Sequence, residues 1–170
     1  MKKGLLFIAL LTVSVLSNAL GAQDYWKATV KKSGSVIVEN KKELTRFKLF
    51  ELDVTVLKNI LTNTPKRNGG LKSDVIVSFP DADGIMNRYT VLENSNMDPE
   101  LEAKYPAIKS YVGKGIEDPR ALIYFSVSPL GLQTMLIRPD RPAEFIEPYT
   151  TDRSSYSVHQ NQFRKLHYNG

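Results

Sequence analysis

The chain has 170 residues, no cysteine, and 23 Lys and Arg against 18 Asp and Glu, which gives a formal net charge of +5. The absence of cysteine excludes a disulfide-stabilised mini-protein and a lipoprotein anchored through a modified cysteine. The fold must therefore be stabilised by a buried core, for which the chain is long enough.

The N-terminus has the pattern of a secretory signal peptide. Lys2 and Lys3 precede an uncharged apolar run from Gly4 to Leu16, and small residues follow it. This run is shorter than the roughly 18 residues that span a bilayer. We predict a cleavable signal peptide over residues 1–22, cut just before Ala22 or Gln23. An exported chain without cysteine favours a bacterial protein that is secreted, at the cell surface or in the periplasm.

The chain that remains after cleavage has about 148 residues, the size of one domain. We expect that domain over residues 23–161, with a tail at 162–170. Without Lys2 and Lys3, 21 basic residues face 18 acidic ones, a net charge of +3. The basic residues form only small separated clusters rather than a stripe with interleaved aromatics, so nucleic acid is not an expected partner.

The first half predicts short strands over Asp24–Val30 and Ser35–Asn40. Apolar spacing of three and four residues then predicts a helix over Asp53–Thr62, which the following Pro65 and Gly69-Gly70 would end. Alternating residues on both sides of an Asp81–Gly84 turn predict a β-hairpin within Ser73–Asn94.

The second half begins with a helix start, because Asp98 can act as N-cap and Pro99 occupies the first helical position. We predict a two-turn helix that Pro106 ends. The resulting fold class is α+β, a mostly antiparallel sheet of six to eight strands with two short helices. The remaining strands are expected over Ala107–Val112, Ala121–Pro129, Leu132–Pro139, Ala143–Tyr149 and, at a sheet edge, Ser155–Gln160.

Two motifs suggest ligand sites but fit turns or sheet connections better. Asp81, Asp83 and Gly84 resemble the start of a calcium loop, yet the twelfth position of that loop is Leu92 instead of Glu. Gly113-Lys114-Gly115 suggests a phosphate loop, yet no helix follows it and two acids come next. We interpret the first as a hairpin turn and the second as a sheet connection.

Catalytic patterns are absent from the sequence. The zinc-protease motif H-E-x-x-H and the serine-hydrolase motif G-x-S-x-G do not occur. His159 and His167 are expected at the surface or on an edge strand. Glu100 and Glu102 fit compensation of a helix dipole. We therefore assign no catalytic, cofactor or metal residue.

Aromatic residues offer one further candidate feature. Tyr105, Tyr111, Tyr124 and Phe125 are expected to pack against the sheet, although an exposed row of aromatic residues could instead bind a partner.

Two segments carry a resemblance to a known family. They are "VIVSFPDADGIMNRYTVLENS" at 75–95 and "MDPELEAKYPAIKSYVGKGIEDPRALIYFSVSPLGLQTML" at 97–136, with "YSVHQN" near the end. Together they resemble the N-terminal propeptide-like region of secreted bacterial, Bacteroidetes-type, reprolysin-family zinc metallopeptidases. The resemblance covers roughly Phe47 to Asn161. The residues that carry it are Pro80, Gly84, Pro99, Leu101, Pro106, Ile108, Tyr111, Gly113, Gly115, Asp118, Pro119 and Gly131.

The resemblance implies a non-catalytic pro-domain that assists folding of a zinc protease or shields its active site. Zinc is expected only in a missing catalytic domain, to which the tail at 162–170 would be a truncated linker. The partner would be that catalytic domain, in cis, or in trans if the chain is complete. With no cysteine to ligate the zinc, we expect steric cover, a carboxylate ligand or, preferably, strand addition at a sheet edge. The alternative is a stand-alone secreted or periplasmic binding module or protease inhibitor.

Overall fold

The structure is a computed structural model that describes residues 25–70, 72–95 and 97–161. Its described part is mostly antiparallel β-structure, with two short α-helices and two 3₁₀ turns at Glu39–Lys41 and Arg67–Gly69. The helices are α1 (Val54–Leu61) and α2 (Pro99–Lys104). The nine strands are β1 (Trp26–Thr29), β2 (Lys48–Leu52), β3 (Ile76–Pro80), β4 (Met86–Glu93), β5 (Lys109–Gly115), β6 (Leu122–Ser128), β7 (Gly131–Arg138), β8 (Arg141–Pro148) and β9 (Tyr156–Gln160).

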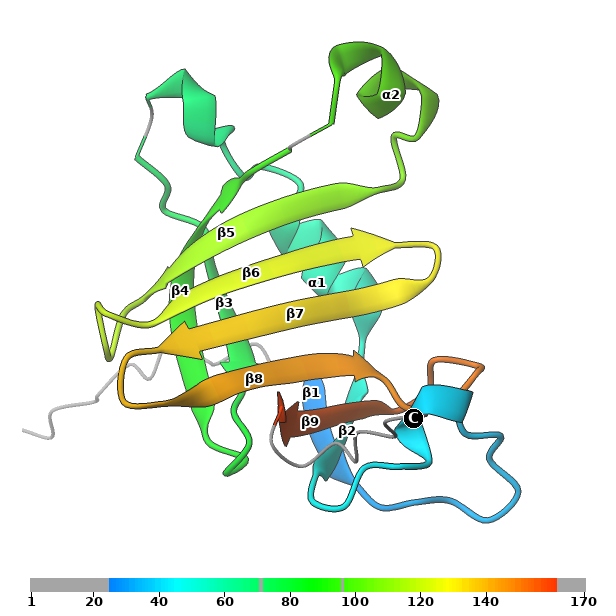
Figure 1. Cartoon of the computed structure of the whole chain (residues 1–170). Coiled ribbons are helices and arrows are strands. Elements are labelled where there is room, and N and C mark those ends of the chain that lie inside the picture. The colour runs from blue at the N-terminus through cyan, green and yellow to red at the C-terminus, as the bar shows by residue number, and fades with distance from the viewer. Residues whose placement is uncertain (1–24, 71, 96, 162–170) are drawn as a thin grey trace, which may run out of the picture.

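All nine strands belong to one sheet, in the order β1-β2-β9-β8-β7-β6-β5-β4-β3. Every pairing in it is antiparallel, and the run from β3 to β8 is a meander of neighbouring strands. The sheet curls into a half-barrel, with β5 to β8 across the front in Figure 1 and β3 and β4 behind them. Strand β9 enters between β2 and β8 and so connects the N-terminal hairpin to the meander.

The core lies between the concave face of the sheet and α1. Side chains alternate along each strand, so that Ile123, Phe125 and Val127 of β6 point inward and are buried. From α1, Leu57 and Leu61 face the same core. The helix fills the inside of the curl, as its position behind β6 and β7 in Figure 1 shows.

Both helices begin where their sequences predict. The Asp53 carboxylate accepts hydrogen bonds from the backbone N–H groups of Thr55 and Val56, which caps α1. Asp98 accepts from Glu100 N and caps α2, with Pro99 at the first helical position. The hairpin of β3 and β4 is also confirmed, with a turn over 81–85 in which Gly84 has a φ of +82°.

Three sequence-based predictions of the fold were wrong. The segment Ser35–Asn40 forms one isolated bridge, between Ile37 and Thr150, and a 3₁₀ turn, instead of a strand. The last strand, β9, lies inside the sheet and not at its edge. The sheet has nine strands instead of six to eight, and one of them, β2, was not predicted.

The curled sheet is closed along its seam by side chains rather than by a strand ladder. The edge strands are β1 and β3. Tyr25, just before β1, donates its hydroxyl to the Ser78 carbonyl at 3.0 Å and accepts from the Ser78 N–H. Trp26 donates its indole N–H to the same carbonyl at 2.9 Å. The two edges of the sheet are thereby held together across the core.

Candidate functional site

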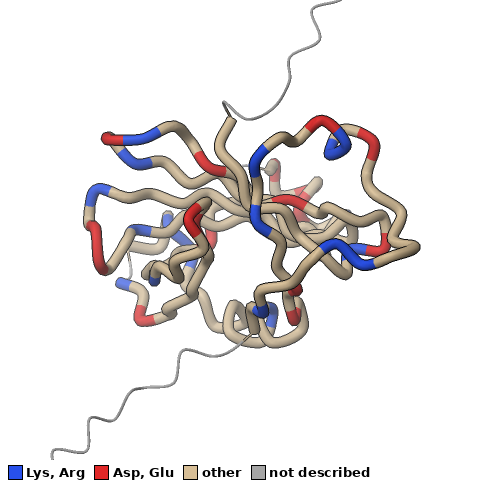
Figure 2. Tube along the Cα trace, turned by 90° about the horizontal axis from the view of Figure 1, so that it is seen from below, with Lys and Arg blue, Asp and Glu red and all other residues tan. Residues whose placement is uncertain are grey.

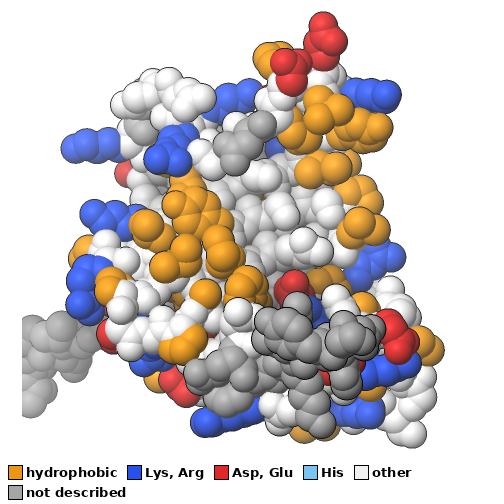
Figure 3. All heavy atoms as spheres, viewed as in Figure 1, with side chains coloured by type: hydrophobic (Ala, Val, Ile, Leu, Met, Phe, Trp, Pro, Cys, Tyr) orange, Lys and Arg blue, Asp and Glu red, His pale blue; other side chains and the backbone are white. Residues whose placement is uncertain are grey.

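The outer, convex face of the sheet carries an apolar patch over four adjacent strands. Its members are in register: Val112 faces Tyr124, Tyr124 faces Met135, Met135 faces Phe145, and Leu122 faces Ile137. Leu122, Tyr124, Met135 and Ile137 are each 36–39% exposed, and Val112 and Phe145 are half-buried. We call these six residues the outer-face patch. Hydrophobic side chains gather over β6 to β8 in Figure 3.

A row of neutral polar side chains runs beside the patch. Ser110, Ser126 and Gln133 occupy the next outward positions of β5, β6 and β7 and face one another across the strands. Together with Tyr124, Met135 and Phe145, they line a shallow groove of about 370 Å³. The groove therefore combines an apolar wall with groups that can donate and accept hydrogen bonds.

Cationic residues border the other end of the patch. Lys114 pairs in register with Leu122, and its ammonium group has no ion pair among the described residues. Arg120 lies in the β5–β6 turn, where its hydrogen bonds to Asp118 lower the pKa of that carboxyl. Arg141, at the β7–β8 turn, pairs with Asp83 at 3.1 Å. A partner with acidic residues at this end would match the free charge of Lys114.

Strand addition, which the sequence suggested, finds little free edge. On β3, the N–H and C=O of Ser78 are occupied by Tyr25 and Trp26, and Pro80 has no N–H to offer. The other edge strand, β1, has only four residues. Short and covered edges are the usual protection against pairing with another chain. Of the surfaces that the sheet offers, the outer face is therefore more accessible to a partner than its edges.

The residues that carry the family resemblance shape β5 and the segments around it. Pro80 ends β3, Gly84 turns the hairpin, and Gly131 begins β7 with a φ of +99°. Asp118 and Pro119 form the β5–β6 turn. Of those on the α2 side, Leu101 is exposed, Pro106 follows the helix, and Ile108 leads into β5. These residues are not brought together into one site.

Two of these residues, both glycines, lie within β5 where another side chain would not fit. A Cβ at Gly113 would lie 2.8 Å from Ile123 Cγ2 and 2.9 Å from Val91 Cγ1. A Cβ at Gly115 would lie 2.3 Å from the Asp118 carbonyl oxygen. The sequence-based interpretation of this segment as a connection is therefore corrected: both glycines belong to the strand, and close packing explains them.

A buried cluster of charged residues was not foreseen from the sequence. Arg138 of β7 donates to Glu144 of β8 at 2.9 Å and to Asp81 of the β3–β4 turn at 3.4 Å. The two carboxylate side chains are each 2% exposed and the guanidinium side chain 10%. The cluster attaches the tip of the β3–β4 hairpin to the β7–β8 hairpin. Inward-facing strand positions with charged residues, Arg138 and Glu144, were the signal that could have revealed it.

The carboxylates of the cluster also organise the turn. Asp81 accepts from the backbone N–H groups of Asp83 and Ile85, and Glu144 accepts from Ala82 N at 3.1 Å. Nearby, Tyr89 is fully buried and its hydroxyl has no partner among the described residues. Burial, more than the surrounding charges, raises the pKa of Tyr89 to about 12. These contacts make the cluster a structural attachment.

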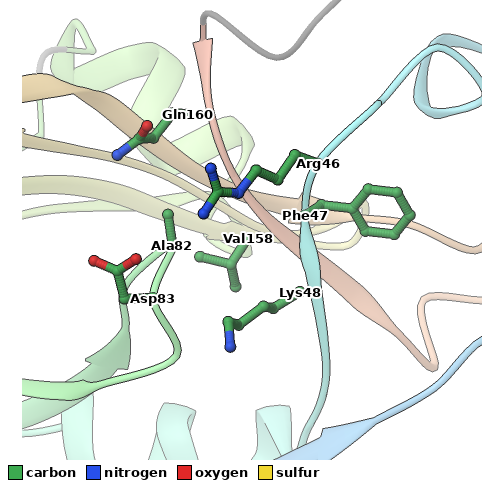
Figure 4. A pocket seen from close by; sticks show the side chains of 7 residues that line it. All are labelled: Arg46, Phe47, Lys48, Ala82, Asp83, Val158 and Gln160. Atoms are coloured by element: carbon green, nitrogen blue, oxygen red, sulfur yellow. The ribbon is translucent and has the colours of Figure 1, made fainter.

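A pocket of about 280 Å³ lies beside the hairpin tip. Figure 4 shows Arg46 and Lys48 reaching from the side of β2 toward the hairpin, with Asp83 on the hairpin opposite them. The Phe47 ring points away and contacts the Tyr149 ring at 5.2 Å between centroids. Three of the lining side chains, Arg46, Lys48 and Asp83, are charged and exposed, so an apolar ligand gains little here.

The prediction that His159 lies at the surface or on an edge strand was wrong. His159 lies in β9 in the middle of the sheet and is 1% exposed, instead of lying at the surface or an edge. Its ring stacks on Phe145 at 5.9 Å, and its Nε2 lies 3.8 Å from a Glu147 carboxylate oxygen. The same carboxylate pairs with buried Lys41. His167, the tail and the predicted signal peptide lie outside the described residues.

The described residues contain no cluster of three or more His, Cys, Asp or Glu that could hold a metal ion. Figure 2 shows cations and anions interspersed along the trace rather than separated onto two faces. Within residues 25–161, leaving out 71 and 96, no helix has the length and hydropathy needed to cross a membrane.

Comparison with family models, with curated proteins and with solved structures found no match to this chain.

Proposed function

We propose that this chain is a non-catalytic binding domain of an exported protein, and that its partner docks on the outer-face patch. The observation that carries the proposal is the patch itself. Six apolar residues lie side by side across β5 to β8, on a face where alternation would normally place polar residues. Contiguous apolar surface of this kind marks interaction sites on folded proteins.

The resemblance in residues 75–136 makes a zinc metallopeptidase catalytic domain the first partner to test. In that case the chain is the pro-domain of a protease precursor, joined to the enzyme in cis or acting on it in trans. It assists folding of the enzyme or covers its active site. The covered edge of β3 favours docking through the outer face over strand addition.

The first experiment measures binding of the chain from residue 23 to a reprolysin-family zinc domain by calorimetry, together with hydrolysis of a peptide substrate. The double variant Tyr124→Glu, Met135→Glu places two carboxylates in the centre of the patch. We expect at least a tenfold loss of affinity, about 1.4 kcal/mol, because central apolar contacts dominate interfaces. The control is Val36→Glu, an exposed apolar residue outside the patch.

The outcomes separate the possibilities. Binding that inhibits hydrolysis supports shielding, and binding that only raises the refolding yield of the enzyme supports folding assistance. Binding to proteases of another class would instead support a stand-alone inhibitor. No binding to any protease, or equal binding by the patch variant, would overturn the proposal. Sequencing the gene past codon 170 distinguishes cis from trans.

A further inference from the structure

A second pocket lies at the C-terminal end of α1, on the concave side of the sheet and away from the outer-face patch. Its volume is about 370 Å³, within the range of roughly 300–1,000 Å³ found for small-molecule sites. We call it the helix-end pocket. It is bounded by the last turn of α1, the segment between α2 and β5, and the inner face of β5 and β6.

The floor of the helix-end pocket is apolar. Leu61 of α1, Tyr111 of β5 and Val127 of β6 line it, and all three are buried members of the core. Pro106 and Ala107 form part of the opposite wall and are exposed. A ligand that entered would thus cover apolar surface that belongs to the core itself.

One polar group within this apolar floor has no partner. Tyr111 is 6% exposed, and no hydrogen bond to its hydroxyl is found among the described residues. Burial raises the pKa of Tyr111, and Glu93 and Lys109 line the pocket together with it. A tyrosine hydroxyl can both donate and accept a hydrogen bond, and since Tyr111 lines the pocket its hydroxyl can donate to a ligand there.

The charge of the lining is positive. Lys109 is paired with Glu93 at 3.0 Å and with Glu102 at 3.3 Å. Lys58, in the last turn of α1, also lines the pocket and has no ion pair among the described residues. The end of the helix dipole contributes about half a negative charge, which reduces but does not cancel the free charge of Lys58.

From the volume of the pocket, its apolar floor, the Tyr111 hydroxyl and the unpaired Lys58, we propose that the helix-end pocket binds a small, largely apolar carboxylate. The apolar part of the ligand lies on Leu61, Tyr111 and Val127. Its carboxylate lies toward Lys58 and accepts a hydrogen bond from the Tyr111 hydroxyl. Since a water molecule occupies roughly 30 Å³, the pocket has room for about a dozen non-hydrogen atoms or more. This site is separate from the outer-face patch and does not depend on the protease partner.

The test uses the chain from residue 23, with 3-phenylpropionate and octanoate as probes. The matched neutral probe is 3-phenylpropanol, and binding is followed by calorimetry and by amide chemical shifts. We expect both carboxylates to bind, 3-phenylpropionate at least fivefold tighter than the alcohol, with shift changes confined to α1, β5 and β6. Equal affinity for the acid and the alcohol would show that the pocket does not select for a carboxylate. Chemical-shift changes at the outer face instead would show that the probes do not bind in the helix-end pocket.

Three variants tie the binding to the named residues. Lys58→Gln should weaken the carboxylates at least fivefold and leave the alcohol unchanged, whereas the control Lys114→Gln, on the outer face, should change neither. Tyr111→Phe should weaken the carboxylates several-fold. Ala107→Trp, at an exposed position, should fill the pocket and abolish binding while the circular dichroism spectrum stays native. Binding that survives both Lys58→Gln and Ala107→Trp, or no saturable binding by either carboxylate, would overturn the proposal.

Discussion

The side chain of Arg138 is the only described cation within 4 Å of Asp81 and is shared with Glu144, so one guanidinium compensates two buried carboxylates. Arg141 adds a weaker contact to Glu144 at 3.6 Å. Removal of one partner from a buried ion pair leaves charge without compensation, which costs far more than the pair itself contributes. At the scale of single residues, loss of the Arg138 guanidinium is therefore expected to have a large effect on stability.

Arg138→Met should lower the free energy of unfolding by about 3–5 kcal/mol, because Asp81 and Glu144 would remain buried without their cation. Urea unfolding followed by circular dichroism measures this. The control is Arg120→Met, which breaks an exposed ion pair with Asp118 and should cost no more than about 1 kcal/mol. Similar losses in the two variants would contradict the role of the buried cluster.

Gly113→Ala should destabilise the protein by about 1–3 kcal/mol, because the added methyl group overlaps with Ile123 and Val91 in the packed core. The matched change Gly69→Ala adds the same methyl group where nothing lies within 4 Å, and should stay within about 0.5 kcal/mol. Thermal unfolding of the two variants in parallel gives the comparison. A neutral Gly113→Ala would show that β5 can shift away from β4 and β6.

At the scale of elements, the parts of the fold with local signals were predictable. Apolar spacing predicted α1, the Asp98 cap with Pro99 predicted the start of α2, and the 81–84 turn predicted the β3–β4 hairpin. The errors concern partners that are distant in sequence. The central position of β9 depends on β2, about 110 positions earlier in the chain, and no local pattern carries that information.

The candidate site was only partly predictable. The alternation along β6 separates Tyr124, on the outer face, from Phe125, in the core, and the sequence did suggest that exposed aromatic residues could bind a partner. That Met135 and Phe145 join Tyr124 in one patch follows from strand register, which hairpin turns fix only approximately. Burial of His159 was missed for the same reason, since it depends on the location of β9.

The seam between β1 and β3 gives a prediction about an element. Tyr25→Phe removes the hydroxyl that bonds to both Ser78 backbone groups, and leaves the Ser78 N–H without an acceptor. We expect a loss of about 1–3 kcal/mol and faster amide exchange at Ser78. Tyr105→Phe, at an exposed tyrosine, is the control and should change neither quantity. Unchanged exchange at Ser78 would mean that the seam is held by Trp26 alone.

At the scale of the whole molecule, buried tyrosines make the free energy of unfolding depend on pH in the alkaline range. Burial raises the pKa of Tyr89 to about 12 and also raises the pKa of other tyrosines in the core. A tyrosine in the unfolded chain ionises near pH 10. Between these two values the unfolded state loses protons that the folded state keeps, so stability is complete below about pH 10 and falls above it.

The free energy of unfolding should therefore be flat between pH 8 and about 9.5 and then decrease. Each buried tyrosine contributes a slope of about 1.4 kcal/mol per pH unit once its unfolded form is ionised. Tyr89→Phe should reduce that slope by roughly 1.4 kcal/mol per pH unit, the contribution of one tyrosine. Urea unfolding from pH 8 to 11.5 measures it, and a slope that is the same in both proteins would show that Tyr89 ionises in the folded state as it does in the unfolded one.

The insertion of β9 between β2 and β8 limits the order in which the strands can pair during synthesis. A nascent chain that has emerged only as far as β8 can complete the meander from β3 to β8 but leaves β2 without its neighbour. We therefore expect the N-terminal hairpin, which is synthesised first, to join the sheet last. Such long-range pairing slows folding and exposes an open strand meanwhile. We therefore expect the complete nine-stranded sheet to form only after the segment around Tyr156 has left the ribosome.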